Sequence, residues 1–283
     1  MADALVVKER CPMTLPPDFD DLAAPADLTS FLALAQARFG ARLAIASSLG
    51  AEDVVLVHAV AAMVRSGAPP IRIFTLDTGR LPQETYELQE QLEARYGVRI
   101  ESFFPSTVAV EDLVRRDGPN GFYHASDARH RCCAVRKLEP LERALLGVDA
   151  WITGLRRAQS VTRTETRWVE HDGTRVKLNP LAAWTDNDVW TFIERERIPY
   201  NVLHDRGYPS IGCAPCTRAV EPGSPARSGR WWWEDPEHKE CGLHVARLRQ
   251  LDAVRRTEAQ KVTESERALG QARRAPRERD PST

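Results

Sequence analysis

Short apolar segments alternate with segments of helical periodicity over residues 28–153 of this 283-residue chain. The expected strands are 42–46, 71–76, 98–104 and 150–153, and the expected helices are 28–39, 54–64 and 82–96. Strand–helix–strand spacing of this kind predicts an α/β fold, a parallel twisted sheet with helices on both faces. Ligands of such sheets bind beyond the carboxyl ends of the strands. The loops 47–53, 77–80 and 154–163 each follow a predicted strand, so we expect them to meet at one edge of the sheet.

Three segments of the chain differ in composition. Residues 1–26 are rich in proline and acidic side chains and are expected to form a flexible lead-in. Residues 27–245 are expected to form one domain, with a further helix over 185–193 and then a loop-rich, mobile C-terminal segment that carries Cys241. Residues 246–283 are mostly charged, which predicts a partly disordered tail.

Charge and hydropathy argue against several classes of function. The formal net charge is −1, so the chain has no overall attraction to nucleic acid or to an anionic membrane. No run of about 18 apolar residues is present, and residues 1–21 lack the basic and apolar segments of a signal peptide. We therefore expect a cytoplasmic protein. In that reducing compartment, clustered cysteines indicate metal or redox sites rather than disulfides.

Four cysteines occur as two pairs, Cys132 with Cys133 and Cys213 with Cys216. A Cys-x-x-Cys motif is compatible with zinc, a redox dithiol or half of an iron–sulfur site. The adjacent pair argues against an ordinary zinc ribbon, whereas four thiols are what an iron–sulfur cluster takes. Adjacent side chains on a helix point about 100° apart, so both can bind one cluster only where the local geometry is distorted. Zinc and two unrelated structural pairs remain alternatives.

A fifth cysteine, Cys241, lies among His238, Lys239 and His244. Nearby cations stabilise the thiolate, which is the reactive form, so Cys241 is a candidate nucleophile and His244 a candidate catalytic partner. The alternative is a buried, inert cysteine, which the charged flank disfavours. Cys11 is assigned no role.

Small residues follow the first predicted strand. Ser47, Ser48 and Gly50 would let backbone N–H groups approach an anion at the start of a helix. The segment 47–53 resembles a modified pyrophosphatase-type loop, usually Ser-Gly-Gly-x-Asp-Ser, but lacks the second glycine, the lysine and the final serine. We therefore expect adenylate binding without ATP cleavage, and an ordinary strand-to-helix turn is the alternative.

Arginines are concentrated in two loops, one after the predicted strand 150–153 and one before the three tryptophans 231–233. Guanidinium groups match phosphate and sulfate geometry through paired N–H donors, so both loops are candidate substrate-binding segments. Solvated surface charge is the alternative, and the tryptophans are expected to pack in the core or a lid. The arginines concerned are Arg156, Arg157, Arg163, Arg227 and Arg230.

Taken together, these motifs resemble the assimilatory sulfonucleotide reductases, and in particular the iron–sulfur adenylyl-sulfate (APS) reductases of the PAPS/APS reductase family. PAPS is 3′-phosphoadenylyl sulfate, and relatives that prefer it generally lack the two cysteine pairs. The matching segments span about 40–245 in the family's order. They are 47–53, 76–81, Cys132-Cys133 with Lys137, 154–160, 213–216, 227–233 and 239–244.

The resemblance implies an adenine nucleotide alpha hydrolase-like sheet and one 4Fe–4S cluster per subunit, held by Cys132, Cys133, Cys213 and Cys216. Lys137, which the sequence alone would leave as an exposed lysine, would lie between cluster and substrate. The loops 47–53 and 76–80 would hold the adenylate, and the arginines before the tryptophans would bind the phosphosulfate. The second of these loops adds the candidate residues Asp77, Thr78 and Gly79.

The activity implied is reduction of APS to sulfite and AMP in assimilatory sulfate reduction, through an S-sulfocysteine on Cys241. By this resemblance the four paired thiols bind the cluster and do not serve as the reductant. The reductant is therefore external, and the resemblance implies thioredoxin or a glutaredoxin-like protein. A homo-oligomer is left open. The alternatives are PAPS or dual activity, an ATP-using adenylate enzyme of the same superfamily, and a non-catalytic zinc or cluster protein that binds a partner.

Overall fold

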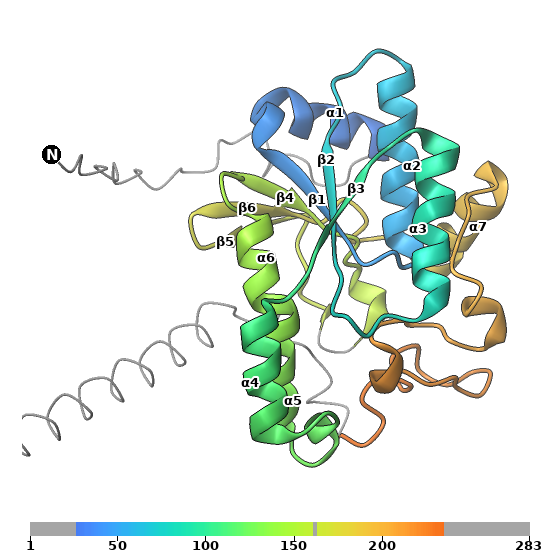
Figure 1. Cartoon of the computed structure of the whole chain (residues 1–283). Coiled ribbons are helices and arrows are strands. Elements are labelled where there is room, and N and C mark those ends of the chain that lie inside the picture. Colours follow the sequence, from blue (N-terminus) through green and yellow to red (C-terminus); the bar gives the residue numbers. More distant parts are fainter. Residues whose placement is uncertain (1–26, 161–162, 235–283) are drawn as a thin grey trace, which may run out of the picture. The chain divides into compact units, whose positions relative to one another are not determined.

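The computed structural model describes residues 27–160 and 163–234. Within these residues six strands form one sheet in the order β3-β2-β1-β4-β6-β5 (Figure 1). Neighbouring strands are parallel except β5 and β6, which form an antiparallel hairpin. The bounds are β1 Leu43–Ser47, β2 Arg72–Leu76, β3 Ile100–Phe103, β4 Ala150–Ile152, β5 Val169–Asp172 and β6 Arg175–Leu178. The predicted α/β fold is confirmed.

Helices connect and cover these strands. Their starts follow local capping chemistry: Asp27 accepts the N–H groups of Thr29 and Ser30, and Thr185 forms a capping box with Asp188. The bounds are α1 Leu28–Phe39, α2 Ala51–Arg65, α3 Gln83–Tyr96, α4 Thr107–Asp117, α5 Ser126–Cys133, α6 Glu139–Ala144 and α7 Asp186–Glu196. Among the described residues no helix is long and apolar enough to cross a membrane.

The two faces of the sheet are covered by different helices, because successive strand side chains point to opposite sides. Ile45 and Ile73 belong to the main apolar core, which includes side chains of α1, α2, α3 and α7. Phe74, one residue further along β2, is buried outside that core. On its face Arg72 donates to the carbonyl of Ala144 in α6 at 2.6 Å. Helices therefore cover both faces, as predicted.

Several elements were not predicted from the sequence. The segment between β3 and β4 contains α4, α5 and α6, and the β5–β6 hairpin adds an antiparallel edge to the parallel sheet. The predicted strand 98–104 is shorter, Ile100–Phe103, and α2 begins at Ala51 rather than at 54. The lead-in 1–26 and the tail 246–283 lie outside the described residues, so their predicted flexibility stays a prediction.

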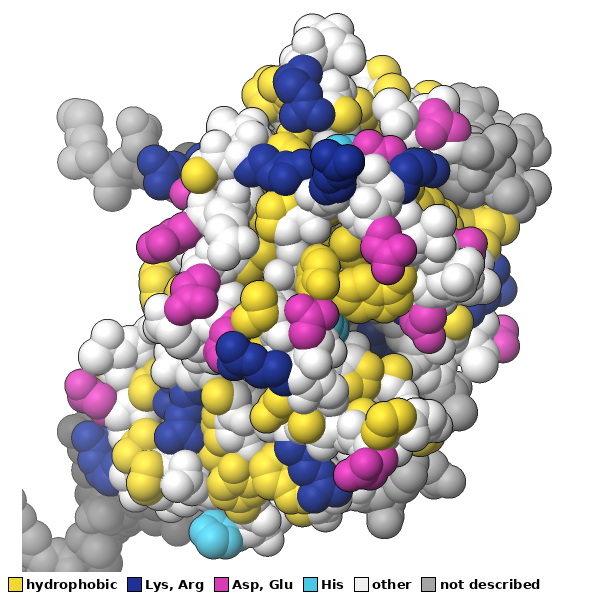
Figure 2. All heavy atoms as spheres, turned by 90° about the vertical axis from the view of Figure 1, so that its right-hand side faces the viewer, with side chains coloured by type: hydrophobic (Ala, Val, Ile, Leu, Met, Phe, Trp, Pro, Cys, Tyr) yellow, Lys and Arg dark blue, Asp and Glu magenta, His cyan; other side chains and the backbone are white. Residues whose placement is uncertain are grey.

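The parallel strands β1, β2 and β4 end at one edge of the sheet, so the loops that follow them lie there together. The strand order runs outward in opposite directions from β1 and β4, which makes their boundary the topological switch point, the usual ligand position in such folds. Figure 2 views the side on which α7 lies in Figure 1 and shows basic and acidic side chains interspersed. This face therefore lacks the continuous basic surface that a nucleic-acid backbone requires.

Candidate functional site

The loop after β1 is held by its own polar groups. Ser48 donates its backbone N–H and its hydroxyl to Oδ2 of Asp53, at 2.5 and 2.7 Å. The N–H of Leu49, which has a φ of 60°, donates to the Ser47 hydroxyl at 3.2 Å. Gly50 is the N-cap residue of α2. The three predicted residues of this loop therefore lie together at a helix N-terminus, and their contact with an adenylate stays a prediction.

The loop after β4 approaches that helix N-terminus closely at Gly154. A Cβ atom there would lie 2.5 Å from Oδ1 of Asp53 and 2.8 Å from the Cβ of Glu52, so a larger residue could not be accommodated without movement. Asp53 is enclosed as a result, and burial raises the pKa of its carboxyl to about 6. The two loops thus meet at the switch point of the sheet.

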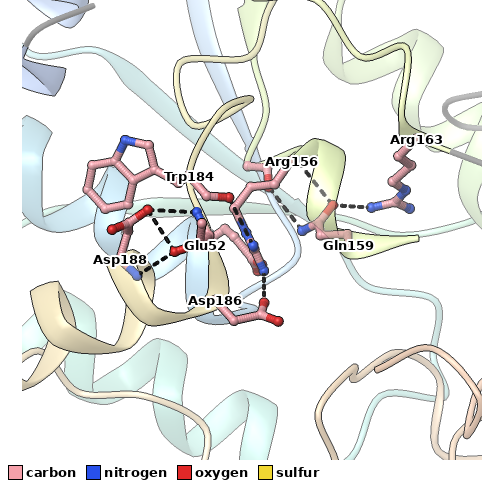
Figure 3. A network of polar contacts seen from close by, with 9 residues as sticks. Glu52, Arg156, Gln159, Arg163, Trp184, Asp186 and Asp188 are labelled. Atoms are coloured by element: carbon pink, nitrogen blue, oxygen red, sulfur yellow. Dashed lines mark hydrogen bonds and ion pairs between the residues drawn. The ribbon is translucent and has the colours of Figure 1, made fainter. Parts of the chain in front are cut away.

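Arg156 joins the loop after β4 to α2 and α7 (Figure 3). Its Nε and Nη2 both donate to Oε1 of Glu52, at 2.8 and 2.6 Å. Its Nη1 donates to the Trp184 carbonyl at 3.2 Å, and Nη2 also pairs with Asp186. The side chain is 5% exposed. This guanidinium is engaged by two carboxylates of the protein, and its predicted substrate contact stays a prediction.

Gln159 organises the remainder of this loop. Its Nε2 donates to the Gly154 carbonyl at 3.2 Å. Its Oε1 accepts the backbone N–H of Arg156 at 3.2 Å and also Nη1 of Arg163 (Figure 3). Arg163 is buried, so its direction is set by Gln159 rather than by solvent. Sequence analysis did not single out Gln159, although it lies within the segment 154–160.

Arg157 takes a different direction from Arg156. Its Nε donates to the Thr166 carbonyl at 2.8 Å, and its Cζ lies 4.8 Å from the centre of the Trp168 ring. Adjacent arginines in this loop therefore have separate protein partners. Their predicted role as a joint substrate-binding set stays a prediction.

The loop after β2 contacts both cysteine segments. The Thr78 hydroxyl lies 3.2 Å from Sγ of Cys213, and the Thr78 carbonyl accepts Nη1 of Arg136 at 2.6 Å. Asp77 shapes the turn, since its Oδ1 accepts the Gly79 N–H at 2.7 Å. The predicted adenylate loop is thus in direct contact with a predicted cluster ligand.

All four paired cysteines line one cavity, the cysteine cavity. Two separate chain segments, 122–137 and 213–231, converge on it. The Cys-x-x-Cys turn also lies against the loop after β2. Four of its lining side chains are cationic and none is acidic. The lining residues are Phe122, Arg129, Cys132, Cys133, Arg136, Lys137, Cys213, Cys216, Arg230 and Trp231.

The helix that carries the adjacent cysteines departs from α geometry directly after them. α5 ends at Cys133, and the π-helical segment η4, Ala134–Leu138, follows at once. π-helical turns are wider than α-helical ones and are common at functional sites. The distortion expected next to two neighbouring cysteine ligands is present, and it carries Lys137 to the cavity wall.

None of the four cysteines in the cavity forms a disulfide. Burial raises the pKa of Cys216 to about 11, and the nearby Cys213 adds to the increase. Burial also raises the pKa of Cys132, against the opposing effect of Arg136. Thiols with such pKa values are protonated at neutral pH and react poorly, whereas metal binding would deprotonate them.

The donor set of this cavity is compatible with an iron–sulfur cluster, because four thiols line it and, among the described residues, no carboxylate or imidazole does. Within residues 27–160 and 163–234, no three His, Cys, Asp or Glu side chains are grouped closely enough to hold one metal ion. Each thiolate of a four-iron cluster binds a different iron, so its ligands stand further apart than those of one ion. The surrounding cations would offset the negative charge of cluster and thiolates. The ligand assignment itself stays a prediction.

Arg230 reaches the cysteine cavity from the segment before the tryptophans. It is 5% exposed, its Nη1 donates to the Ile211 carbonyl at 3.0 Å, and its Cζ lies 4.8 Å from the centre of the Trp231 ring. The Cζ of Arg227 lies 5.8 Å from the same ring. Trp231 is buried, as expected, and has a φ of 41°. The structure brings both predicted arginines to one indole at the edge of the cavity.

Arg129 is a buried cation that sequence analysis missed. Its side chain is fully buried, its Nε donates to Oε1 of Glu234 at 2.7 Å, and its Cζ lies 4.7 Å from the Trp231 ring centre. It is also hydrogen-bonded to the Cys133 sulfur. The spacing of four residues between Arg129 and Cys133 places them on one helix face, and that pattern could have indicated the contact.

Cys11, Cys241 and His244 lie outside the described residues, so the predicted nucleophile and its partner stay predictions. Asp53 and Glu52 were not singled out from the sequence. Two acidic residues in the first turn of a helix that follows a candidate anion loop were the available signal.

Comparison with known proteins agrees with this geometry. Residues 42–219 match the phosphoadenosine phosphosulfate reductase domain. Adenosine 5′-phosphosulfate reductase of Allochromatium vinosum is 57% identical over 204 residues, which cover 71% of this chain and 78% of that protein. The protein of the same name from Burkholderia cepacia is 50% identical over 214 residues, covering 75% and 84%.

A solved structure shares the fold. The crystal structure of phosphoadenylyl-sulfate (PAPS) reductase from Candida auris, in a phosphate complex, has a TM-score of 0.61 and 25% identity. The match covers 74% of this chain and all of that chain. The resemblance inferred from the motifs is confirmed, and the chain belongs to the phosphoadenosine phosphosulfate reductase domain family.

Proposed function

We propose that this protein reduces adenosine 5′-phosphosulfate to sulfite and AMP in sulfate assimilation, through an S-sulfocysteine on Cys241. Relatives at 57% and 50% identity carry the name of this activity. The observation that carries the proposal is the position of Arg230, which lines the same cavity as the four paired cysteines. The arginine proposed to bind the sulfate group and the four cysteines proposed to bind the cluster line the same cavity, which supports this assignment.

Substrate binding is assigned to the sheet edge and the cysteine cavity together. The loops after β1 and β2 hold the adenosine part, and Arg227 and Arg230 hold the phosphosulfate. Lys137, on the wall of the same cavity, adds a third positive charge. These cations offset the repulsion between an anionic substrate and an approaching thiolate, and they stabilise charge on the departing phosphate.

The first chemical step is attack of the Cys241 thiolate on the sulfate sulfur. An S–S bond forms, the bond from that sulfur to the bridging oxygen breaks, and AMP leaves with the electron pair. The product on the protein is Cys241 S-sulfonate. His244 is proposed to favour the thiolate form of Cys241 before attack.

The second step takes two electrons from an external dithiol protein of the thioredoxin or glutaredoxin kind. One of its thiolates attacks Sγ of Cys241 and releases sulfite, leaving a mixed disulfide. Its second thiolate then attacks the mixed disulfide, which returns Cys241 to the thiolate and leaves the partner oxidised. Sulfur passes from the sulfate to the sulfite level, and one dithiol becomes a disulfide.

The paired cysteines are assigned to one 4Fe–4S cluster per subunit. When bound, the cluster would supply a rigid, charged centre next to the cationic side chains that bind the substrate. It would not carry electrons. The chain itself orients these sulfurs, through the Thr78 hydroxyl at Cys213 and the Arg129 guanidinium at Cys133. We also assign the protein to the cytoplasm.

The test is sulfite production by protein purified without oxygen, assayed with APS and with PAPS, each with and without thioredoxin. The proposal expects sulfite from APS only when the reductant is present. The Cys241→Ser variant should fold and retain iron yet produce no sulfite. Wild-type turnover by this variant would overturn the mechanism. The Cys11→Ser variant is the control, because Cys11 belongs to neither cysteine pair of the sequence and is assigned no role.

The same preparation separates the alternatives. Equal rates with both nucleotides would indicate dual specificity, and ATP consumption would indicate an ATP-using enzyme. One zinc ion per chain with no acid-labile sulfide and no sulfite would favour a non-catalytic metal protein. Size-exclusion chromatography with light scattering would give the oligomeric state.

A further inference from the structure

The loop after β1 directs hydrogen-bond donors toward the protein's own carboxylate. In a phosphate-binding loop, backbone N–H groups at a helix N-terminus point to the ligand. Here the N–H and the hydroxyl of Ser48 both donate to Oδ2 of Asp53, and the Leu49 N–H donates to the Ser47 hydroxyl. Asp53 therefore occupies the position that a ligand anion would take.

Asp53 is also fixed in place. It is 6% exposed, and its Oδ1 faces Gly154, where even a Cβ atom would come within 2.5 Å. The carboxylate is thus enclosed between the loop after β1 on one side and the loop after β4 on the other. It cannot leave this position without disturbing both loops.

The neighbouring acid differs from Asp53 in its electrostatic partner. Glu52 is paired with the Arg156 guanidinium at 2.6 Å. Within residues 27–160 and 163–234, Asp53 has hydroxyl and backbone donors but no ion pair with a cation. Its charge is therefore uncompensated at the helix terminus where the phosphates of a nucleotide would otherwise bind.

We infer that Asp53 is a specificity-determining residue, an internal anion that occupies the phosphate position of the loop after β1 and excludes nucleoside triphosphates from the adenylate site. The inference rests on the proposed function, in which the phosphosulfate lies toward Arg230 and the cysteine cavity rather than on this loop. A triphosphate placed on the loop could not accept hydrogen bonds from Ser48, and the negative charge of the Asp53 carboxylate would repel it.

The test measures AMP and ATP affinity by calorimetry on the anaerobically purified full chain, without magnesium, at pH 8. Burial raises the pKa of Asp53 to about 6, so the carboxylate is ionised at that pH. Asp53→Asn keeps an acceptor for Ser48 and removes the charge, whereas Asp53→Ala removes both. We expect the ATP-to-AMP affinity ratio to rise roughly tenfold in the asparagine variant.

A matched control and a second variant keep the test decisive. Asp112→Asn makes the same charge change at an exposed position on α4, where the side chain is 64% exposed, and should alter neither affinity. Asp53→Ala should increase ATP affinity at least as much as Asp53→Asn, and circular dichroism and iron content check that each variant is folded. A gain in ATP affinity that is confined to the Asp53 variants supports the inference.

Two results would overturn it, and they are distinguishable. If wild type binds AMP but the ATP-to-AMP affinity ratio is the same in all variants, Asp53 does not determine specificity, and the proposed reductase function stands. If wild type fails to bind AMP at all, the adenylate site fails together with the inference that depends on it.

Discussion

The two arginine loops look alike in sequence but use their charge differently. In the loop 154–163, Arg156 is paired with Glu52 and Asp186, so its charge is balanced by the protein. Arg230 instead lies over Trp231 in the cysteine cavity, whose lining includes no carboxylate. Its buried Nε has no hydrogen-bond partner among the described residues.

This difference indicates that Arg156 mainly stabilises the fold, whereas Arg230 is suited to bind an anion. A compensated, buried guanidinium is already satisfied and contributes mainly to structure, whereas an uncompensated one favours a bound anion. Compensation by protein carboxylates therefore distinguishes Arg156 from Arg230. The Glu52–Asp53 pair shows the converse for acids, since of these two only Glu52 has a cationic partner among the described residues.

The largest expected effect comes from removing the arginine that is paired with protein carboxylates. Arg156→Met leaves the Glu52 carboxylate, whose side chain is 17% exposed, without its cation, so we expect a loss of about 3–5 kcal/mol in the free energy of unfolding. Urea titration measures it. The double variant Arg156→Met, Glu52→Gln should recover most of that loss, because no unpaired charge remains. A purely kinetic defect with unchanged stability would instead support the substrate contact predicted for Arg156.

The next effect concerns the uncompensated side. Arg230→Gln should lower kcat/KM for APS by about 100-fold, equivalent to ~3 kcal/mol, because a cation that meets the phosphosulfate is lost. Steady-state sulfite assays measure it. Arg218→Gln is the control, since Arg218 also stacks on a tryptophan of this group, Trp232 at 5.4 Å, but does not line the cysteine cavity. Equal losses in both variants would contradict the distinction.

Much of the scaffold was predictable because buried strands and helices have a recognisable arrangement of apolar residues in the sequence. The strands β1, β2 and β4 are short, mostly apolar and largely buried segments, and their carboxyl ends locate the loops. α4 was missed although Val110, Leu113 and Val114 have helical spacing, and of its residues Leu113 alone is buried. The β5–β6 hairpin did leave a signal in the sequence, because Asp172 pairs with Arg175 and Gly173, with a φ of 65°, takes the first position of the two-residue turn, which favours glycine.

The candidate site was predictable in part. Motifs supplied the cysteines and arginines, because their chemistry depends on residue type. They could not show which charges are compensated, since Glu52 and Arg156 are 104 residues apart and meet only when the sheet forms. Arg129 lies in the mostly polar sequence of α5 and would be judged an exposed residue from its type alone, although it is buried.

A smaller expected effect tests the uncompensated acid. The pKa of Asp53 is about 6 in the folded protein and ordinarily 3.8, so the folded state holds this proton more tightly. The free energy of unfolding therefore falls as pH rises from about 4 to above 6, by about 2–3 kcal/mol for this carboxyl alone. Asp53→Asn should be more stable than wild type at pH 8 and not at pH 4, as urea titrations at both values would show. An equal difference at both pH values would refute this.

The smallest expected effect tests whether the structure around Arg156 affects stability alone or also affects catalysis. Thr185→Ala removes the capping box of α7, in which the Thr185 hydroxyl accepts the Asp188 N–H at 3.1 Å, and should cost about 1 kcal/mol in unfolding free energy. Thr185→Ser keeps the hydroxyl and is the matched control. Because α7 supplies Asp186 to the compensated arginine and nothing to the lining of the cysteine cavity, kcat/KM for APS should change less than about twofold. A tenfold loss of kcat/KM in the alanine variant would show that the two regions are coupled, and the contrast between the arginine loops would then describe one site rather than two.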